Sequence, residues 1–565
     1  MLPAQRAGAC ASLGTAERAS VTSRPSPPLP APDDGGVQTV ASSAGQSRWV
    51  SAFDARPWLL AVLMGALASV VGFAGSWRVS MWIDEGYTLS VATRSVHDVW
   101  RMVHTIDIVH ALYNVILHPW LQIVGVSAAS VRLPSTLAVG VAGAGVVVLT
   151  RRLAGTHAAI AAGLVFAVLP RVTSIGMEGR SYATTTAVAV WMTVLFVSLI
   201  RRPALAKYIG YAVLGAFAIS LNIFLVLLLG AHGVALLIDR RFQLSRIFWS
   251  WLAAAIAALV GGMPVLLVAM SQAGQIGPTR LSLLGYARSA LVNQWFLGET
   301  PTIFVSGGTI TGSADAHDWW KPASVLLAAV CWLIGAYAVL RRDPAGDAPA
   351  GRPGFRPVLL SWIIIPTAAL IGYALVGSPI YNPRYLSFGA PAVTALVGIG
   401  LVRLRWGWPR WVAAALILVL AVPVYASQRT PYAKGGADWM QVSQFVAEHR
   451  GPGDAVYFAP RQPPTGNVIR LTSRTAAILY PAAYAGMVDL TLVSTPAQSG
   501  DLLGVSRMLT ASADELDGIT SVFVVRRRDY PAASVASDTA VLARAGFRPG
   551  PSWQGPIDNV TQFVR

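Results

Sequence analysis

Two adjacent carboxylates, Asp84 and Glu85, follow the first long apolar run of this chain in the stretch SMWIDEGYTLS. Charged groups at a membrane boundary are costly unless they pair or line a water-filled cavity. Neighbouring residues on a helix point about 100° apart, so the two carboxylates are not expected to share one proton. One of them is suited to be a general base, and the other an orienting or metal-binding partner. The alternative is an ordinary solvated loop or a helix-capping acid.

The stretch DIVHALYN places Asp107, His110 and Tyr113 at successive three-residue steps, roughly on one face of a helix or its entry turn. An Asp and a His at this spacing suit a divalent cation, a phosphate held by an imidazolium, or a helix cap. Two ligands do not specify a metal ion. A metal site at Asp107 and His110 is therefore one of three open interpretations.

Two later turns, RVTSIGMEGRSYA and SPIYNPRYLSFGAP, carry an arginine near acidic or tyrosine residues: Glu178, Arg180 and Tyr182 in the first, and Tyr381, Arg384 and Tyr385 in the second. A guanidinium can hold a phosphate through two parallel hydrogen bonds. The simpler interpretations are a local ion pair and interfacial tyrosines. Arg132, in SVRLPSTLA, is expected to hold either the loop carboxylates or the same anionic ligand. We favour binding of a donor phosphate and substrate by this group.

The composition is that of a membrane protein. Of the 565 residues, 54% are hydrophobic and 12% are charged, whereas about 25% are charged in ordinary soluble domains. The formal net charge of +17 comes mostly from arginines in short clusters between apolar runs, which is how membrane orientation is encoded. No basic stripe with interleaved aromatic residues occurs, so nucleic acid is not an expected partner. Cys10 and Cys331 offer neither a disulfide framework nor a CxxC metal site.

The apolar runs predict about 11 membrane-spanning helices between residues 57 and 427. The run 207–238 is too long for one crossing, and SLN at 220–222 predicts a break within it. The segment 109–126 is apolar on only part of its circumference. If it lies in the membrane surface, the arginine clusters all fall on one side, as the positive-inside rule requires. We therefore expect an interfacial helix there, with the amino terminus in the cytoplasm and the carboxyl terminus outside.

The chain divides into three predicted parts. Residues 1–56, rich in Ala, Ser, Pro and Gly, are typical of a disordered leader, here cytoplasmic. Residues 57–427 are expected to form a transmembrane catalytic domain, in which residues 78–130 make the first extracytoplasmic loop with the interfacial helix. In residues 428–565, DWMQVSQFVAEHR and DTAVLARAGF predict helices, and the segment 454–459, ITSVFVVRRR and VTQFVR predict strands. A small extracytoplasmic α/β domain is expected from them.

In their order, the motifs WIDEGYT, DIVHALYNVILHPWLQIVGVSAASVRLPSTLA, RRLAG, MEGRSYA and NPRYL resemble the GT-C glycosyltransferases, over about residues 57–402. The similarity is to the branch with protein O-mannosyltransferases and the lipid A aminoarabinose transferase, which is family 39-like. It implies a polytopic α-helical GT-C fold and a polyprenyl-phosphate-linked sugar used at the outer membrane face. It further implies that Asp84 acts as base or positions the acceptor, with Glu85 beside it. The family commonly has His-Pro-Pro or Lys-Pro-Pro before Leu-Tyr, whereas VHALY lacks the prolines, which leaves the role of His110 open.

The resulting expectation is a glycosyltransferase that moves a sugar, with mannose favoured, from a polyprenyl-phosphate donor to an acceptor hydroxyl with inversion. Its expected partners are membrane lipid, the lipid-linked donor and a glycan, glycolipid or protein acceptor, and a divalent metal ion is an open alternative as cofactor. Its expected location is a bacterial plasma membrane, with the site on the extracytoplasmic side. A transporter or flippase of lipid-linked intermediates would instead place charges in mid-helix, and a nonenzymatic scaffold would tolerate alanine at the loop residues.

Overall fold

Eight helices are long and apolar enough to cross a membrane in the described part of this computed structural model, which comprises residues 53–104, 106–272, 280–299, 304–306, 309–311, 319–341, 354–404, 407–462 and 468–565. They are α2 (Pro57–Phe73, continued by η1, Ser76–Arg78), α6 (Ala128–Ala154), α9 (Tyr182–Arg201), α12 (Arg246–Ser271), α15 (Lys321–Leu340), α16 (Phe355–Val376), α17 (Ala390–Arg403, preceded by η5, Pro383–Gly389) and α18 (Trp408–Ser427). A helix satisfies its own backbone groups, as a hydrocarbon layer demands. The chain is a polytopic membrane protein, as its composition predicts.

Three shorter apolar helices lie where the other crossings were expected: α7 (Thr156–Val168), α10 (Leu205–Leu221) and α11 (Val226–Ile238), the last preceded by η2 (Ile223–Leu225). The predicted break at 220–222 is confirmed, because α10 ends at Leu221 and the Asn222 side chain accepts a hydrogen bond from the N–H of Phe224. Each of these helices is shorter than 18 residues, so the total of 11 crossings stays a prediction.

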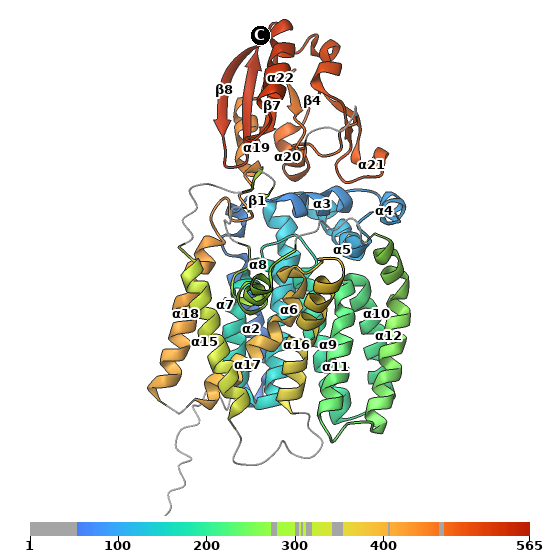
Figure 1. Ribbon diagram of the computed structural model, residues 1–565, viewed down its shortest axis with the longest axis vertical. Coiled ribbons are helices and arrows are strands. Elements are labelled where there is room, and N and C mark those ends of the chain that lie inside the picture. Colours follow the sequence, from blue (N-terminus) through green and yellow to red (C-terminus); the bar gives the residue numbers. More distant parts are fainter. Residues whose placement is uncertain are drawn as a thin grey trace, which may run out of the picture. The chain divides into compact units, whose positions relative to one another are not determined.

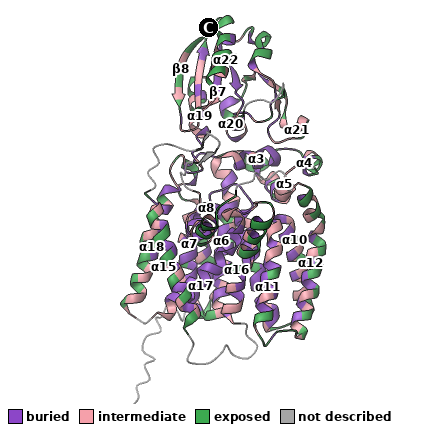
Figure 2. Cartoon of the chain, viewed as in Figure 1, coloured by how far each residue is buried: buried purple, intermediate pink, exposed green. Residues whose placement is uncertain are grey.

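The helices differ in how far they are covered by their neighbours (Figure 2). In α17, 89% of the most apolar window is buried, whereas in α18 the share is 22%. Close approach of α2 to α6 depends on small residues, since a Cβ added to Gly65 would lie 2.6 Å from the carbonyl oxygen of Gly140. This contact fixes α6 beside the helix that leads into the acidic pair.

Three helices, α3 (Ile83–Ala92), α4 (Val96–Val103) and α5 (Ile108–Val124), follow α2 and lie together at one end of the long helices (Figure 1). The α5 helix covers residues 109–124 of the predicted interfacial segment and contacts α3, α4, α10 and α12. Its placement in the membrane surface stays a prediction. Shorter elements near this end are α8 (Pro170–Ile175), α13 (Leu283–Arg288), η4 (Ser289–Asn293), α14 (Gln294–Phe296) and the antiparallel strands β1 (Phe304–Ser306) and β2 (Thr309–Thr311).

The carboxyl-terminal residues form a small α/β domain around a sheet with the strand order β4-β3-β7-β9-β8. Its strands are β3 (Ala455–Phe458), β4 (Val488–Asp489), β7 (Ser521–Arg527), β8 (Arg548–Gln554) and β9 (Asp558–Val564). β3 is parallel to β4 and β7, and β9 is antiparallel to β7 and β8. Beside them are α19 (Trp439–His449), α20 (Thr475–Leu479), η6 (Pro481–Tyr484), α21 (Pro496–Ser499), η7 (Leu509–Ala511), η8 (Ala513–Leu516), α22 (Ala532–Arg544), and the pair β5 (Leu492–Ser494) and β6 (Val505–Ser506).

The fold class predicted from the sequence is confirmed: a helical membrane protein carries a carboxyl-terminal α/β domain. The predicted helices of that domain are α19 and α22, and the three predicted strands are β3, β7 and β9. The described residues belong to one compact unit that includes this domain. Residues 1–52 of the predicted leader lie outside the described residues.

Candidate active site

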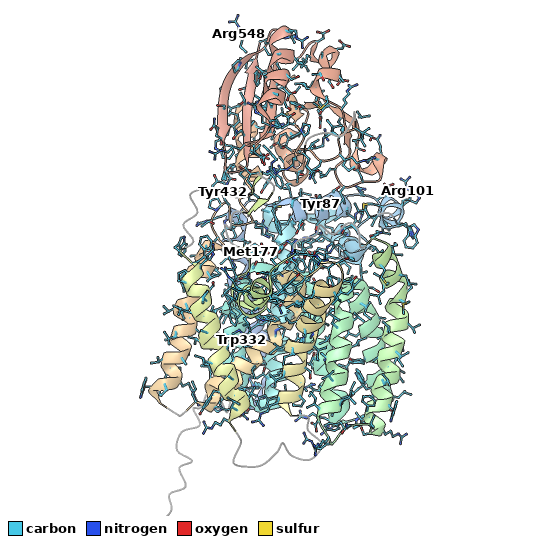
Figure 3. All side chains as sticks on the ribbon, in the orientation of Figure 1. Tyr87, Arg101, Met177, Trp332, Tyr432 and Arg548 are labelled. Carbon is cyan, nitrogen blue, oxygen red and sulfur yellow. The ribbon has the colours of Figure 1, made fainter. Side chains whose placement is uncertain are left out.

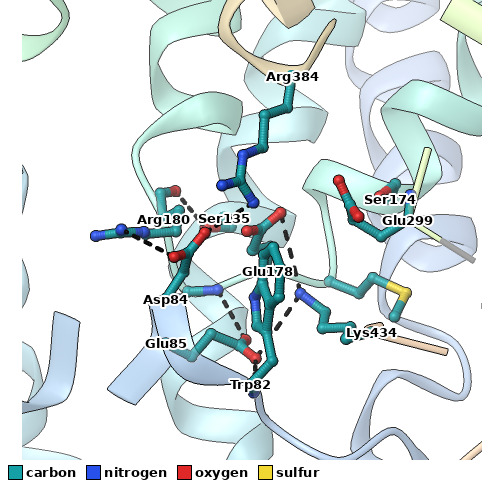
Figure 4. A network of polar contacts seen from close by, with 12 residues as sticks. Trp82, Asp84, Glu85, Ser135, Ser174, Glu178, Arg180, Glu299, Arg384 and Lys434 are labelled. Atoms are coloured by element: carbon teal, nitrogen blue, oxygen red, sulfur yellow. Dashed lines mark hydrogen bonds and ion pairs between the residues drawn. The ribbon is translucent and has the colours of Figure 1, made fainter. Parts of the chain in front are cut away.

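The acidic pair lies in the first turn of α3, where exposed helix N–H groups favour negative charge. Trp82 is the N-cap residue in extended conformation, and its N–H donates to Glu85 at 3.3 Å, the return bond of a capping box. Asp84 and Glu85 are both buried. Their side chains point to different partners (Figure 4).

Asp84 faces two arginines that come from distant parts of the sequence. One carboxylate oxygen lies 2.7 Å from Nη1 of Arg384, in η5, and the other lies 3.6 Å from Nη2 of Arg180, in the turn before α9. Burial by itself would raise the pKa of Asp84, but the charges of Arg384, Arg180 and Lys434 outweigh burial and lower it. Asp84 is therefore an ionised carboxylate between two guanidinium groups.

Glu85 is enclosed completely. It accepts two hydrogen bonds of 2.7 Å from Arg132 and one of 3.0 Å from the N–H of Gly179. Burial would raise its pKa, but Arg132, Lys434 and these hydrogen bonds lower the pKa to about 2. With every lone-pair direction engaged, Glu85 anchors α3 to α6 and to the turn before α9. This geometry is consistent with the predicted orienting role, which stays a prediction.

Arg132 has no N–H left for a ligand. Besides its two bonds to Glu85, the guanidinium donates to the carbonyl oxygens of Ser76, Val79 and Ser80 at 2.5, 2.9 and 3.3 Å. Its side chain is fully buried. Of the two roles expected for Arg132, this geometry favours holding the loop carboxylate, and the predicted binding of donor phosphate is corrected accordingly.

A buried lysine completes the cluster around Glu85 (Figure 4). Lys434 lies in the turn after α18, and its ammonium is 3.7 Å from Glu85 and 4.0 Å from Glu178. It also lies 5.5 Å from the ring centroid of Trp82. Burial lowers the pKa of Lys434, whereas the two carboxylates oppose that shift. Burial raises the pKa of Glu178, with Lys434 and Arg384 opposing.

Aromatic rings hold Arg384 in place. Its guanidinium carbon is 4.8 Å from the Trp82 ring centroid and 6.0 Å from that of Tyr182, distances at which a cation is attracted to a ring face. Tyr182 and Tyr385 lie with ring centroids 6.4 Å apart. The arginines of both turns, Arg180 and Arg384, thus meet at Asp84.

Arg180 and Arg384 each keep a buried Nε–H for which the described residues provide no hydrogen-bond acceptor. Buried donors of this kind are normally satisfied. A phosphate placed between the two guanidinium groups would supply the missing oxygens. The site therefore combines an ionised carboxylate with donors for an anion.

Asp107 and His110 lie beside this site as a loose pair, with 4.0 Å between the Asp107 carboxylate and Nε2 of His110. Burial raises the pKa of Asp107 to about 6 although Arg180 opposes the shift, and burial with the charges of Arg180 and Arg384 lowers the pKa of His110. Within the described ranges, no three His, Cys, Asp or Glu side chains are grouped to hold a metal ion. The donor set at this pair does not fit a resident divalent ion without further ligands.

Tyr113 connects the site to an apolar groove. Its hydroxyl lies 3.3 Å from that of Ser135, which donates to the carbonyl oxygen of Arg180 at 3.2 Å. The groove, of about 320 Å³, is lined by Tyr113, Ile116, Leu117, Trp120, Pro134, Leu137, Ala138 and Thr184. Ile116 and Leu137 are exposed, so the groove opens on the outside of the helices.

Tyr381 differs from the other predicted residues. Its hydroxyl donates to the Gln294 side chain at 2.9 Å, and its ring packs against Tyr286. This places Tyr381 in the packing of α13 and α14 against η5. The structure does not bring Tyr381 into contact with Asp84.

Comparison with known proteins gives two kinds of match. Residues 111–267 match the model of the dolichyl-phosphate-mannose-protein mannosyltransferase family. Two structures of ArnT from Cupriavidus metallidurans, one bound to undecaprenyl phosphate and one in the apo state, superpose with TM-scores of 0.52 and 0.53 at 13% and 14% identity. Each alignment covers 90% of this chain and 98% of ArnT. The chain therefore shares its fold with ArnT, and this fold is of the GT-C type.

The resemblance seen in the sequence is thereby confirmed at the level of the GT-C fold. A chloramphenicol resistance protein from Streptomyces lividans is 27% identical over 251 residues, which cover 42% of this chain and 62% of that protein. The chain thus spans less than two thirds of this relative's length.

Sequence reasoning missed Lys434, Trp82 as a platform for Arg384, and the pair of Arg171 with Glu299 at 3.8 Å. Lys434 is one of only a few lysines in an arginine-rich GT-C chain, a signal that could have marked it. Tyr87 lies on α3, and Tyr432 lies in the turn that carries Lys434. The two tyrosines are at a similar height along the long axis of the molecule (Figure 3).

Proposed function

We propose that this chain transfers a sugar from a polyprenyl-phosphate donor to an acceptor hydroxyl at the outer face of the plasma membrane of a bacterium. The observation that carries the proposal is the position of Asp84, 2.7 Å from Arg384 and 3.6 Å from Arg180. One carboxylate thus lies within reach of two groups suited to a phosphate. The reaction needs both, a proton acceptor and a cationic site for the leaving group.

Asp84 is proposed as the base. It is ionised at neutral pH because the arginines lower its pKa. A base of this kind takes the proton of the acceptor hydroxyl late in the displacement, and general-base catalysis contributes about 10²-fold to 10⁴-fold. Direct attack by that oxygen on the anomeric carbon breaks the bond to the phosphate oxygen and inverts the anomeric centre.

Arg180 and Arg384 are proposed to bind the phosphate of the donor. Each guanidinium has five N–H donors. Only some of these donors face Asp84, so the others are proposed to bind phosphate oxygens. Negative charge grows on the phosphate as the sugar leaves, so fixed cations stabilise the transition state more than the ground state. Glu178, Tyr182 and Tyr385 are proposed to line the same donor site, in contact with the cations.

The polyprenyl chain is proposed to lie in the groove beside Tyr113. Its walls are almost entirely apolar, and its inner end is linked through Ser135 to the backbone of Arg180. An apolar chain in this groove would place its phosphate toward the arginines. Undecaprenyl phosphate, which is bound in one of the two ArnT structures, belongs to the same chemical class.

Mannose is the proposed sugar, supported by the description of the family that matches residues 111–267. The acceptor is proposed to be a glycan, a glycolipid or a protein hydroxyl. An extracytoplasmic location of the site is supported by the arginine clusters, such as Arg341 and Arg403, whose helix ends meet through a hydrogen bond from Arg341 to the carbonyl oxygen of Arg403. The positive-inside rule puts such clusters in the cytoplasm.

The test is transfer by the purified full chain in lipid nanodiscs from radiolabelled polyprenyl-phosphate mannose to a membrane extract of its host. Asp84→Asn is expected to lower transfer at least about 10²-fold, while Asp98→Asn, at an exposed ion pair on α4, is expected to leave it unchanged. Transfer at the wild-type rate by the Asp84→Asn variant would refute the proposed role of Asp84. Glycans of a deletion strain compared with its parent identify the acceptor.

A further inference from the structure

The carboxyl-terminal domain contacts the helix that carries Asp84 at three places. These contacts involve the segment just before α3, the body of α3 and its end. The domain side is supplied by residues that are distant in sequence, between Met440 and Leu502. Contacts before, within and at the end of α3 restrict its movement more than a single contact would.

The first contact is at the entry to α3. The N–H of Met81 donates to the hydroxyl of Tyr480 at 2.8 Å, and the N–H of Met440 donates to the hydroxyl of Ser80 at 3.1 Å. Ser80 and Met81 are buried. Without Tyr480 the N–H of Met81 would lose this partner, which is costly for a buried donor. These bonds fix the chain just before α3 begins, close to Asp84 in the sequence.

The second contact lies within α3, at the glycine that follows the acidic pair. A Cβ added to Gly86 would lie 2.7 Å from Cγ2 of Thr475 and 3.7 Å from Cγ of Leu479, both on α20. Separations under 3.0 Å are not tolerated without movement. Glycine at this position therefore permits α20 to pack directly on the backbone of α3.

The third contact is at the end of α3. The hydroxyl of Ser90 donates to the carbonyl oxygen of Leu502 at 2.5 Å. Arg94 is buried, and its guanidinium donates to the carbonyl oxygens of Ser90 and Asp501. The end of the helix is thus bound to the loop between α21 and β6.

We propose that the carboxyl-terminal domain is a positioning element for Asp84, through Tyr480 and through Thr475 against Gly86, and is not an independent module. This inference rests on the proposed function of Asp84 as base. A small displacement of α3 would break its 2.7 Å contact with Arg384. Effects on catalysis from misplaced groups of this kind reach about 10²-fold.

The first experiment adds a methyl group to α3 at position 86, where the helix packs against α20. Gly86→Ala is expected to lower kcat about 10-fold or more, with the KM for the lipid-linked donor nearly unchanged, because the donor-binding arginines do not move. Thr475→Ser alone removes only Cγ2 and is expected to lower kcat by less than Gly86→Ala does. The double variant is expected to regain most of the lost kcat. Wild-type kcat in Gly86→Ala, or no rescue by Thr475→Ser, would overturn the proposal.

The second experiment removes the hydroxyl of Tyr480, which accepts the hydrogen bond from the N–H of Met81. Tyr480→Phe is expected to lower kcat several-fold with little change in KM. Tyr484→Phe is the matched control, since the Tyr484 hydroxyl lies 3.2 Å from that of Ser443 within the domain. Equal effects of the two variants on kcat would show a general loss of domain stability and would count against a positioning role of Tyr480.

The third experiment separates this inference from the proposed function. The variant is Gly86→Cys with Thr475→Cys, in a chain with Cys10 and Cys331 replaced by Ser. A Cβ at position 86 would lie 2.7 Å from Cγ2 of Thr475, so the two cysteines are close enough for a disulfide to be tested. We expect the cross-link to form under mild oxidation in nanodiscs and the cross-linked protein to retain transfer. A cross-link in a protein whose wild type shows no transfer would refute the proposed function alone. Loss of transfer on cross-linking, or no cross-link in an active enzyme, would refute the positioning role.

Discussion

The carboxylate of Asp84 lies 2.7 Å from the guanidinium of Arg384, although one belongs to the first helix after α2 and the other to the turn that begins the helix α17. Arg384 is held from other sides by the rings of Trp82 and Tyr182. The arginine therefore keeps its place if Asp84 is neutralised. Arg384 lowers the pKa of Asp84, and in the proposed function it also binds the donor phosphate.

Arg384 is expected to be needed for both the rate and donor binding. Arg384→Gln should lower kcat/KM for the lipid-linked donor by about 10²-fold to 10³-fold, as loss of one donor to developing charge does. Arg384→Lys should have a kcat/KM between those of Arg384→Gln and the wild type. A lysine ammonium keeps the charge but cannot form the planar two-bond contact with a phosphate. The measurement is steady-state transfer in nanodiscs.

Arg101→Gln is the matched control for that experiment, since Arg101 is exposed and pairs with Asp98 on α4. Surface pairs of this kind contribute little. A loss in Arg101→Gln comparable with the loss in Arg384→Gln would mean that the change in net charge, and not the site, causes the effect.

The pH profile of transfer should report the charges around Asp84. Its pKa is below the usual value in the folded protein, so the base stays ionised and active as pH falls through the usual carboxyl range. Arg180→Gln removes one charge that lowers this pKa. The acidic limb of the kcat/KM profile should therefore move to higher pH in the variant. An acidic limb at the same pH in both proteins would contradict the role of Asp84 as the titrating base.

The sequence was sufficient to predict the fold at the level of its elements. The break at 220–222 is local, because Asn222 bonds to a residue only two positions away. The strands β3 (AVYF) and β7 (SVFVVRR) contain short apolar runs rich in β-branched and aromatic residues, a pattern that predicts strands from the sequence alone. Helix lengths were less predictable, since α7, α10 and α11 have 13, 17 and 13 residues, fewer than the roughly 20 that one crossing needs.

The candidate site was predictable where charge at a membrane boundary marked it. Asp84, Arg180 and Arg384 are such residues, and they meet. Which of its two expected roles Arg132 takes was not predictable, because the sequence does not reveal that its N–H groups bond to Glu85 and to three carbonyl oxygens. Lys434 was missed because it follows the last membrane helix, and only tertiary packing returns it to Glu85.

Glu85 is expected to matter for stability more than for catalysis. Glu85→Gln leaves Arg132 as a buried charge without its carboxylate, which costs about 3–5 kcal/mol. The pKa of Glu85 is lowered to about 2 from the usual value of 4.5. Its stabilisation is therefore complete above the unfolded value and is lost as pH falls from about 4.5 toward 2. Thermal unfolding in detergent at pH 7 and at pH 4 measures both effects.

The control for Glu85 is Glu448→Gln, at an exposed position on α19. It should change the Tm by less than the scatter of the assay. A Tm of Glu85→Gln equal to that of the wild type at pH 7 would show that the buried pair with Arg132 does not support the fold.

Lys434 is expected to stabilise the site by compensating two buried carboxylates. Its ammonium lies 3.7 Å from Glu85 and 4.0 Å from Glu178, and Glu85 keeps Arg132 when the lysine is lost. Lys434→Met should therefore lower the Tm chiefly because Glu178 becomes a buried charge with fewer cations. Adding Glu178→Gln to this variant should restore part of the loss in Tm. The expected coupling free energy between the two positions is about 0.5–3 kcal/mol. Strictly additive losses in the double variant would show that Lys434 and Glu178 do not interact.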